Sequence, residues 1–382
     1  MRSLFYAIFF LIYLPAAFAE SFTLKPFNLG NGVYSSLALD NQANVLFAWN
    51  EGNTLLSKNF LANGTFTEPT ALSETIELIS SSMSVDGLGN ATLLFVDGSG
   101  NLKAARLAAG AKAWQIFPYP LGKVDHLLET PLYIGSSNAG DTIATWVYEG
   151  KLQTARADAL GNWIRIQDLP VSASGHNYVQ VTMGKNGLAA VVWEDEKFHV
   201  YSATLQPYAT AWSKPMCITA KAYSGFQKVA IGPDNTVLVV WKTMGHDVGL
   251  NGAVKAAILS PGSNKWQGID SPGPAVWGEA IDLTVNANGD FLALWTNSSD
   301  PNGIHTFLKT AWLLKHSKKW TKSEKIASMD FISRVSISLD DNGNAVATWE
   351  PLMGLYTAVQ SAGRGFSSIH ELSKRGNSLT KP

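Results

Sequence analysis

The feature that most constrains the fold is a pair of aromatic positions that recurs seven times along the chain. Eleven of the 13 tryptophans occupy these two positions. The first follows an apolar run and holds Trp49, Phe95, Trp146, Trp193, Trp241, Trp295 and Trp349, at spacings of 46, 51, 47, 48, 54 and 54 residues. The second comes 17 to 25 residues later and holds Phe66, Trp114, Trp163, Trp212, Trp266, Trp320 and Phe366. A period of this length is typical of solenoids, propellers and other repeat arrays.

Each repeat has the residue types of antiparallel strands joined by tight turns. Short polar residues and a glycine precede the first aromatic, as in Asp340-Asp341-Asn342-Gly343-Asn344, and such a pattern favours a hairpin turn. The strand before this turn carries a small residue at one position in every repeat, namely Ala38, Ser84, Gly135, Thr182, Ala230, Thr284 and Ser338. We interpret this strand as the innermost one, where only small side chains fit.

The strand after the turn is apolar nearly throughout, as in residues 237–241, which is typical of a strand buried on both faces. A third strand follows, and the second aromatic opens a fourth, outermost strand, where proline and charge are tolerated at the free edge. The sequence therefore predicts an all-β fold, a seven-bladed β-propeller of four-stranded antiparallel blades.

The pattern Asp-x-x-Gly-Asn-Ala-x-x-x-Trp, followed by a second Trp, resembles the repeats of bacterial secreted β-propeller proteins of the broad WD40-like or sialidase-like superfamily. The resemblance covers residues 21–373. It implies the fold and leaves the function open, because propellers carry many unrelated activities.

The N-terminus has the composition of a secretory signal peptide. Arg2 precedes an apolar stretch from Leu4 to Leu14, and Ala17-Phe18-Ala19 forms a cleavage site, so we expect cleavage after Ala19 and a secreted or periplasmic protein. We expect residues 20–373 to form a single propeller domain and residues 374–382 a polar tail. Residues 22–29 resemble a fourth strand, so we expect them to complete the last blade, with residues 366–372 competing for or supplementing that edge.

Composition excludes several classes of function. The mature chain has 28 basic and 30 acidic residues, so it has no basic field for nucleic acid. No later stretch has the roughly 20 apolar residues that span a bilayer. Cys217 is the only cysteine, so no intramolecular disulfide forms, and the seven histidines have no metal-ligand spacing. We expect a monomer without cofactor or metal, in which Asp40, Asp86 and Asp340 bond their own turns rather than calcium.

Sialidases are secreted propellers that recognise a carboxylate through three convergent arginines. Here Arg106, Arg156 and Arg165 fall on predicted third or fourth strands, and Arg334 alone borders an innermost strand. Bidentate pairing with one carboxylate would require these guanidinium groups to meet. The sequence therefore argues against sialidase activity.

Departures from the repeat indicate where a site lies. The loops after the second strands of blades five and six are enlarged, and the blade connections on the same face are rich in aromatic and polar residues. Trp277 is one of two tryptophans outside the repeat positions, and the other, Trp312, is expected to pack in a third strand. The candidate binding residues are Tyr133, His176, Tyr178, Phe226, Lys228, Trp277, Glu279, Asp282, Arg334, His246, Asp300 and His305.

Exposed aromatic residues with convergent polar groups are typical of a site for a glycan, peptide or protein. The first hypothesis is therefore an exported, non-catalytic binding module that uses this face. Its alternative is a hydrolase or lyase acting on a polysaccharide or glycoconjugate, with acid and base drawn from Glu279, Asp282, His176 and His126. A third possibility is a structural or adhesive scaffold. For each candidate residue, simple packing, or ion pairing between Lys228 and Asp282, remains an open alternative.

Overall fold

The computed structural model describes residues 33–40, 42, 44–73, 81–124, 132–170, 179–219, 224–243, 252–276, 280–298, 303–352 and 354–373. Within these ranges it contains 29 strands, no helix, and therefore no helix able to cross a membrane. The strands form seven antiparallel sheets, which confirms the predicted all-β, seven-bladed β-propeller. The signal peptide, the strand predicted at residues 22–29 and the tail at residues 374–382 lie outside the described residues.

The chain divides into two compact units, one of residues 1–191 and 203–215 and the other of residues 192–202 and 216–382. The first unit holds blades 1 to 3. Blade 1 comprises β1 (Val33–Leu39), β2 (Val45–Glu51), β3 (Thr54–Phe60) and β4 (Thr70–Ser73). Blade 2 comprises β5 (Ser81–Val85), β6 (Ala91–Val96), β7 (Asn101–Leu107), β8 (Gln115–Ile116) and β9 (Gly122–Lys123). Blade 3 comprises β10 (Tyr133–Ser136), β11 (Thr142–Tyr148), β12 (Lys151–Ala157) and β13 (Trp163–Pro170).

Blade 4 contributes residues to both units, and the second unit holds blades 5 to 7. Blade 4 comprises β14 (Gln180–Met183), β15 (Ala189–Glu194), β16 (Val200–Leu205) and β17 (Met216–Cys217). Blade 5 comprises β18 (Ser224–Ile231), β19 (Val237–Thr243), β20 (Ala253–Leu259) and β21 (Gln267–Pro274). Blade 6 comprises β22 (Ile281–Val285), β23 (Phe291–Ser298), β24 (His305–Leu313) and β25 (Glu324–Asp330). Blade 7 comprises β26 (Arg334–Leu339), β27 (Ala345–Glu350), β28 (Leu355–Gln360) and β29 (His370–Ser373).

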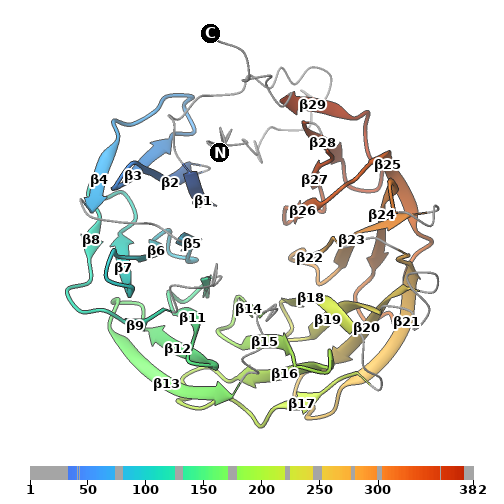
Figure 1. Ribbon diagram of the computed structural model, residues 1–382, viewed down its shortest axis with the longest axis horizontal. Helices are drawn as coiled ribbons and strands as arrows, with labels where there is room; N and C mark the ends of the chain where they lie inside the picture. Colours follow the sequence, from blue (N-terminus) through green and yellow to red (C-terminus); the bar gives the residue numbers. More distant parts are fainter. Residues whose placement is uncertain are drawn as a thin grey trace. The chain divides into compact units, whose positions relative to one another are not determined.

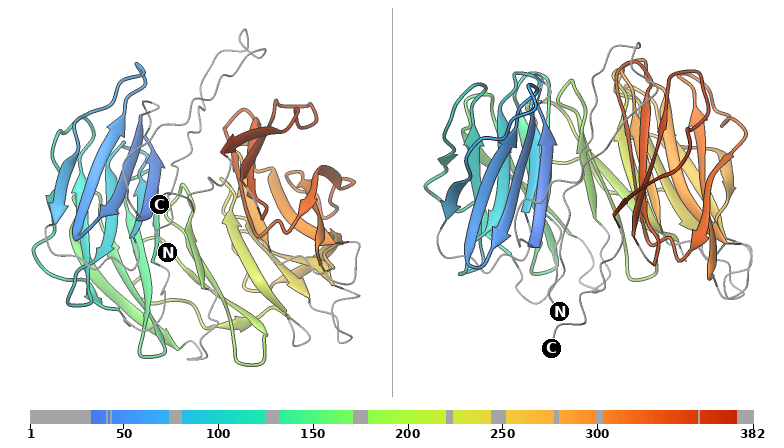
Figure 2. Two further views of the ribbon diagram at one scale, coloured as in Figure 1. Left: turned by 45° about the horizontal axis from the view of Figure 1, so that its top comes forward. Right: turned by 90° about the horizontal axis from the view of Figure 1, so that it is seen from above.

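In the second unit the first strands β18, β22 and β26 lie side by side, and the last strands β21, β25 and β29 lie at the opposite edge (Figure 1). In the first unit β5 contacts both β1 and β10, β8 and β13 lie at the opposite edge (Figure 1), and neighbouring sheets stack face to face (Figure 2). The fourth strand of blade 7 is β29, which lies almost wholly in the segment expected only to compete for or supplement that edge. Each described blade is thus built from consecutive strands.

Packing between neighbouring blades explains the first aromatic position. Trp146 is fully buried, together with Ala144 and Ala155 of its own blade, against Leu94 and Leu102 of blade 2. An aromatic side chain of this size buries about 150–250 Å². At about 25 cal/mol per Å² this gives an upper limit of about 4–6 kcal/mol for each such residue.

The small residues predicted for the innermost strands are required where two first strands approach each other. Gly135 in β10 faces Met183 in β14, and a Cβ atom added to Gly135 would lie 3.0 Å from the Met183 nitrogen. Real Cβ atoms rarely come so close to backbone. The interpretation of this strand as the crowded, innermost one is confirmed at this position.

The polar turn residues bond within their own blade. The Asp86 Oδ1 atom accepts hydrogen bonds from the nitrogens of Leu88 and Asn90, at 2.9 and 2.8 Å. The Asn90 side-chain oxygen in turn accepts a bond from the Ala109 nitrogen in the next turn of the blade, at 3.1 Å. Asp40 and Asp340 bond their own turns in the same way. The role of the Asn as a link between two turns was not predicted from the sequence.

Candidate functional site

Half of the predicted binding residues lie outside the described residues. They are His176, Tyr178, His246, Trp277, Glu279 and Asp300. His126, a candidate acid or base, also lies outside them. Their part in a binding site stays a prediction.

Tyr133, at the start of β10, is placed by packing and by one hydrogen bond. The Gln180 side-chain nitrogen donates to the Tyr133 hydroxyl at 3.1 Å. Burial raises the pKa of Tyr133 above its ordinary value, although this hydrogen bond opposes the shift. The residue therefore remains a neutral phenol that links β10 to β14.

Phe226 and Lys228 lie on β18, and Asp282 lies on the neighbouring β22. Phe226 has a positive φ of 55° within an irregularity of the β18–β19 pairing, and its ring packs against the hydrophobic core. The Lys228 Nζ atom lies 3.9 Å from Asp282 Oδ1, and Asp282 Oδ2 accepts a bond from the Ile337 nitrogen at 2.9 Å. Burial raises the pKa of Asp282, while Lys228 and the backbone bonds oppose the shift. The pair thus connects three consecutive first strands, and one carboxylate oxygen already has a backbone partner.

Arg334 and His305 are more exposed. The Arg334 side chain is 75% exposed and lies 3.6 Å from a Glu350 carboxylate oxygen. His305, at the start of β24, contacts the Asp330 carboxylate through Nδ1 at 3.1 Å and the Ser328 hydroxyl through Nε2 at 2.9 Å. This is the bonding order of a Ser-His-Asp triad, but the orienting acid of such a triad is buried. Asp330 is 62% exposed, so the arrangement is explained by pairing of side chains on the open face of a sheet.

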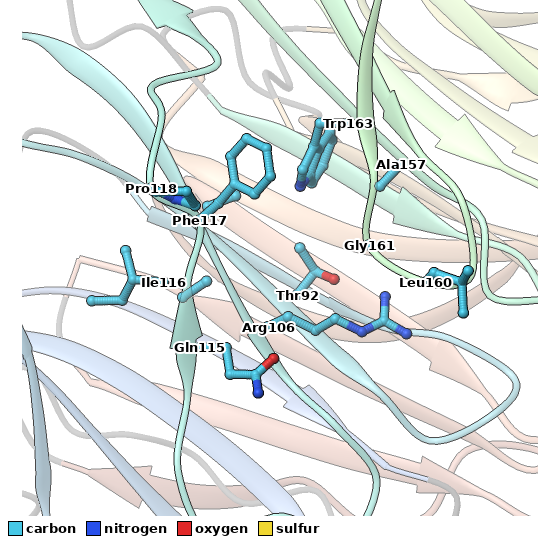
Figure 3. A pocket seen from close by; sticks show the side chains of 12 residues that line it. Thr92, Arg106, Gln115, Ile116, Phe117, Pro118, Ala157, Leu160, Gly161 and Trp163 are labelled. Carbon is cyan, nitrogen blue, oxygen red and sulfur yellow. The ribbon is translucent and has the colours of Figure 1, made fainter.

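The sequence did not predict a cavity of about 220 Å³ between blades 2 and 3, within the first unit. Aromatic and polar side chains share its lining, and in Figure 3 the rings of Phe117 and Trp163 lie above Thr92 and Arg106. Gln115 lines the cavity from the outer strand of blade 2. An apolar cavity with a few polar groups is typical of a binding site for a small molecule.

The cavity lies where the outer strand of blade 2 is interrupted. Residues 115–116 and 122–123 form two short strands, β8 and β9, that pair with separate parts of β7. Pro118 and Pro120 lie between them, and proline has no N–H to continue a ladder. Phe117 and Pro118 line the cavity from this break. The two prolines are the signal from which the irregularity could have been predicted.

Arg106 supplies the positive charge at this cavity. Its Nη2 atom donates to the Ala159 carbonyl oxygen at 2.8 Å and lies 3.7 Å from Asp86 Oδ2. Arg156, at the same point of the third strand in blade 3, lies 3.2 Å from Asp141. Each of these two arginines thus has its own acidic partner on its own blade, which supports the argument against a sialidase centre.

Among the described residues, no group of three or more His, Cys, Asp or Glu side chains is placed to hold a metal ion.

Comparison with known proteins supports the fold alone. No family model matches the chain, and no curated protein matches its sequence. The BP39L lectin from Burkholderia pseudomallei matches with a TM-score of 0.62 and 15% identity, over 89% of this chain and 98% of that one.

Two further structures match at lower TM-scores. AofleA from Arthrobotrys oligospora gives 0.48 at 14% identity, over 76% of this chain and 85% of that one. The six-bladed lectin of Aleuria aurantia gives 0.46 at 14% identity, over 74% and 90%. Neither is similar enough to argue from.

Proposed function

We propose that this protein is an exported glycan-binding module without catalytic activity. The observation that carries the proposal is the cavity between blades 2 and 3, which combines the rings of Phe117 and Trp163 with the side chains of Arg106, Thr92 and Gln115. Sugars present apolar C–H faces that pack on aromatic rings and hydroxyl groups that bond to amides and guanidinium groups. The site therefore has both kinds of group that a sugar requires.

The size of the cavity limits the ligand. The cavity's volume of about 220 Å³ is below the roughly 300–1,000 Å³ of pockets that hold drug-sized ligands. We therefore expect recognition of a single terminal residue of a glycan. The name of the Burkholderia pseudomallei neighbour, a lectin, makes glycans the first ligands to test.

Export and oligomeric state complete the proposal. The apolar segment from Leu4 to Leu14 and the Ala17-Phe18-Ala19 motif support cleavage after Ala19 and release to the periplasm or the exterior. We propose that the mature chain acts as a monomer. The connection face that includes Trp277 remains a second candidate surface, whereas a hydrolase receives no support from the exposed Ser328, His305 and Asp330.

The test is a glycan array probed with the mature chain, residues 20–382, followed by calorimetry with the sugars that bind. Trp163→Phe and Arg106→Met should each weaken binding by about tenfold, since each removes a donor from the cavity. Trp266→Phe is the matched control, because it changes the same repeat position in blade 5. Absence of binding to every glycan would contradict the proposal. Binding by all three variants that equals binding by the wild-type chain would also contradict it.

A further inference from the structure

One position of the third strand bonds the tryptophan of the following blade. In β3 it is Ser57, which pairs with Ala48, and in β12 it is Thr154, which pairs with Thr145. The Ser57 hydroxyl accepts a bond from Trp114 Nε1 at 3.0 Å. The Thr154 hydroxyl accepts one from Trp212 Nε1 at 3.1 Å. Where the hydroxyl is present in the first unit, the next indole N–H is therefore satisfied.

Blade 2 departs from this rule. Ala104 occupies the same register position, opposite Leu94, and has no hydroxyl to offer. Ala104 and Trp163 both line the cavity, Trp163 is half-buried, and no described residue accepts a hydrogen bond from its indole. An indole nitrogen can only donate, so its acceptor here is water or a ligand oxygen.

Two positions in the second unit show that an alanine does not by itself create a cavity and that a hydroxyl does not always bond an indole. Ala256 pairs with Val240 at the same register, and the Trp320 indole nitrogen is buried without a described partner. Ile258 and Ile269 pack there with Trp320, in the same hydrophobic cluster as Ala256. Ser202 in the third strand of blade 4, β16, carries a hydroxyl, but this hydroxyl has no described hydrogen-bond partner.

The groups around Trp163 define the chemistry of the ligand. The indole N–H and the Arg106 guanidinium group are donors only, so they require acceptor oxygens. Asp86, at 3.7 Å from Arg106, balances the charge of the guanidinium group and disfavours an acidic ligand. The Phe117 ring offers an apolar surface beside these donors. A neutral sugar residue meets all three requirements.

We propose that Ala104 is the specificity-determining residue of this cavity. By withholding the hydroxyl that satisfies the indole in neighbouring blades, it leaves the Trp163 N–H to bind a hydroxyl or ring oxygen of one neutral sugar residue. This inference rests on the proposed function, because it assumes that the cavity binds a glycan.

The test uses Ala104→Ser and Ala104→Thr, which restore the side chains found at Ser57 and Thr154. Each should weaken binding of the array-selected sugar by about tenfold or more, since the new hydroxyl accepts the Trp163 bond and fills part of the cavity. Trp163→Phe should add little further loss in the Ala104→Thr background, because the two changes remove the same bond. Ala256→Thr makes the same change at a position without a described cavity and should leave binding unaltered.

The outcomes separate this inference from the proposed function. If the wild-type chain binds no glycan, the proposed function fails and the inference fails with it. If the wild-type chain binds a glycan and Ala104→Ser and Ala104→Thr bind it equally well, only the role of Ala104 is refuted. Thermal unfolding of each variant identifies a loss of binding that is due to unfolding. Ala104→Ser adds only one oxygen atom, so it should destabilise the protein less than Ala104→Thr.

Discussion

Replacement of a turn aspartate tests whether these residues hold the hairpins together. Asp86 is 3% exposed and accepts three hydrogen bonds, two from the backbone nitrogens of Leu88 and Asn90 and one from the Asn90 side-chain nitrogen. Asp86→Ala removes all three and leaves the donors without their acceptor. At about 1 kcal/mol for each bond, and more for bonds to a charged group, we expect a loss of about 3–4 kcal/mol in the free energy of unfolding.

Asp158 provides the matched control, because it makes the same three bonds to Leu160 and Asn162 but is exposed. The Asn162 side chain makes the largest contribution to lowering the pKa of Asp158. Water replaces the lost acceptor at this exposed turn, so Asp158→Ala should cost about 1 kcal/mol.

Urea titrations of both variants give the two free energies, and titrations with calcium or a chelator should leave the wild-type midpoint unchanged. Equal losses in the two variants would refute the argument from burial. A calcium-dependent midpoint would refute the assignment of these aspartates to their own turns.

Two further changes test packing and burial. Gly135→Ala places a methyl group about 3 Å from Met183 and should destabilise the protein by about 1–3 kcal/mol, whereas Gly268→Ala, with open space around it, should change the urea midpoint little. Burial raises the pKa of Glu194 to about 7, from an ordinary value of 4.5, with Asp195 adding to the shift. The unfolded chain therefore loses this proton first as the pH rises, and the wild-type protein should lose up to about 3 kcal/mol of stability between pH 4.5 and 7. Glu194→Gln should remove that loss, and urea midpoints at pH 4.5 and 8 measure it.

The fold could be predicted because its main constraints recur along the chain. A strand buried between two blades must be apolar on both faces, so a run such as residues 237–241 marks β19 without knowledge of its neighbours. The hairpin turns are local as well, since Asp86 bonds residues two and four positions ahead. Signals of this kind lie within a few residues of the structure that they specify.

The cavity could not be predicted because it depends on residues from different blades. The bond between Trp212 and Thr154 joins residues 58 positions apart, and it can be identified only when the register of both strands is known. Ala104 is small in a strand that holds other small residues, so nothing in its local sequence distinguishes it. The aromatic residues of the blade connections instead predicted a binding site on the connection face. On that face Phe226 contributes to packing and Lys228 to an ion pair.

The contrast between blades 2 and 5 indicates what opens a site in a repeated fold. Both blades have alanine in place of the hydroxyl residue, at Ala104 and Ala256, and no described residue accepts a hydrogen bond from the next indole, which is half-buried at Trp163 and buried at Trp320. The outer strand of blade 5 is continuous over Gln267–Pro274, and the Trp320 nitrogen beside it is buried. In blade 2 the outer strand breaks at Pro118 and Pro120, and the space beside Trp163 is a cavity. In the proposed site, the absent hydroxyl leaves the indole without an acceptor in the protein, and the break in the strand gives a ligand room to reach it, so the proposal requires both departures.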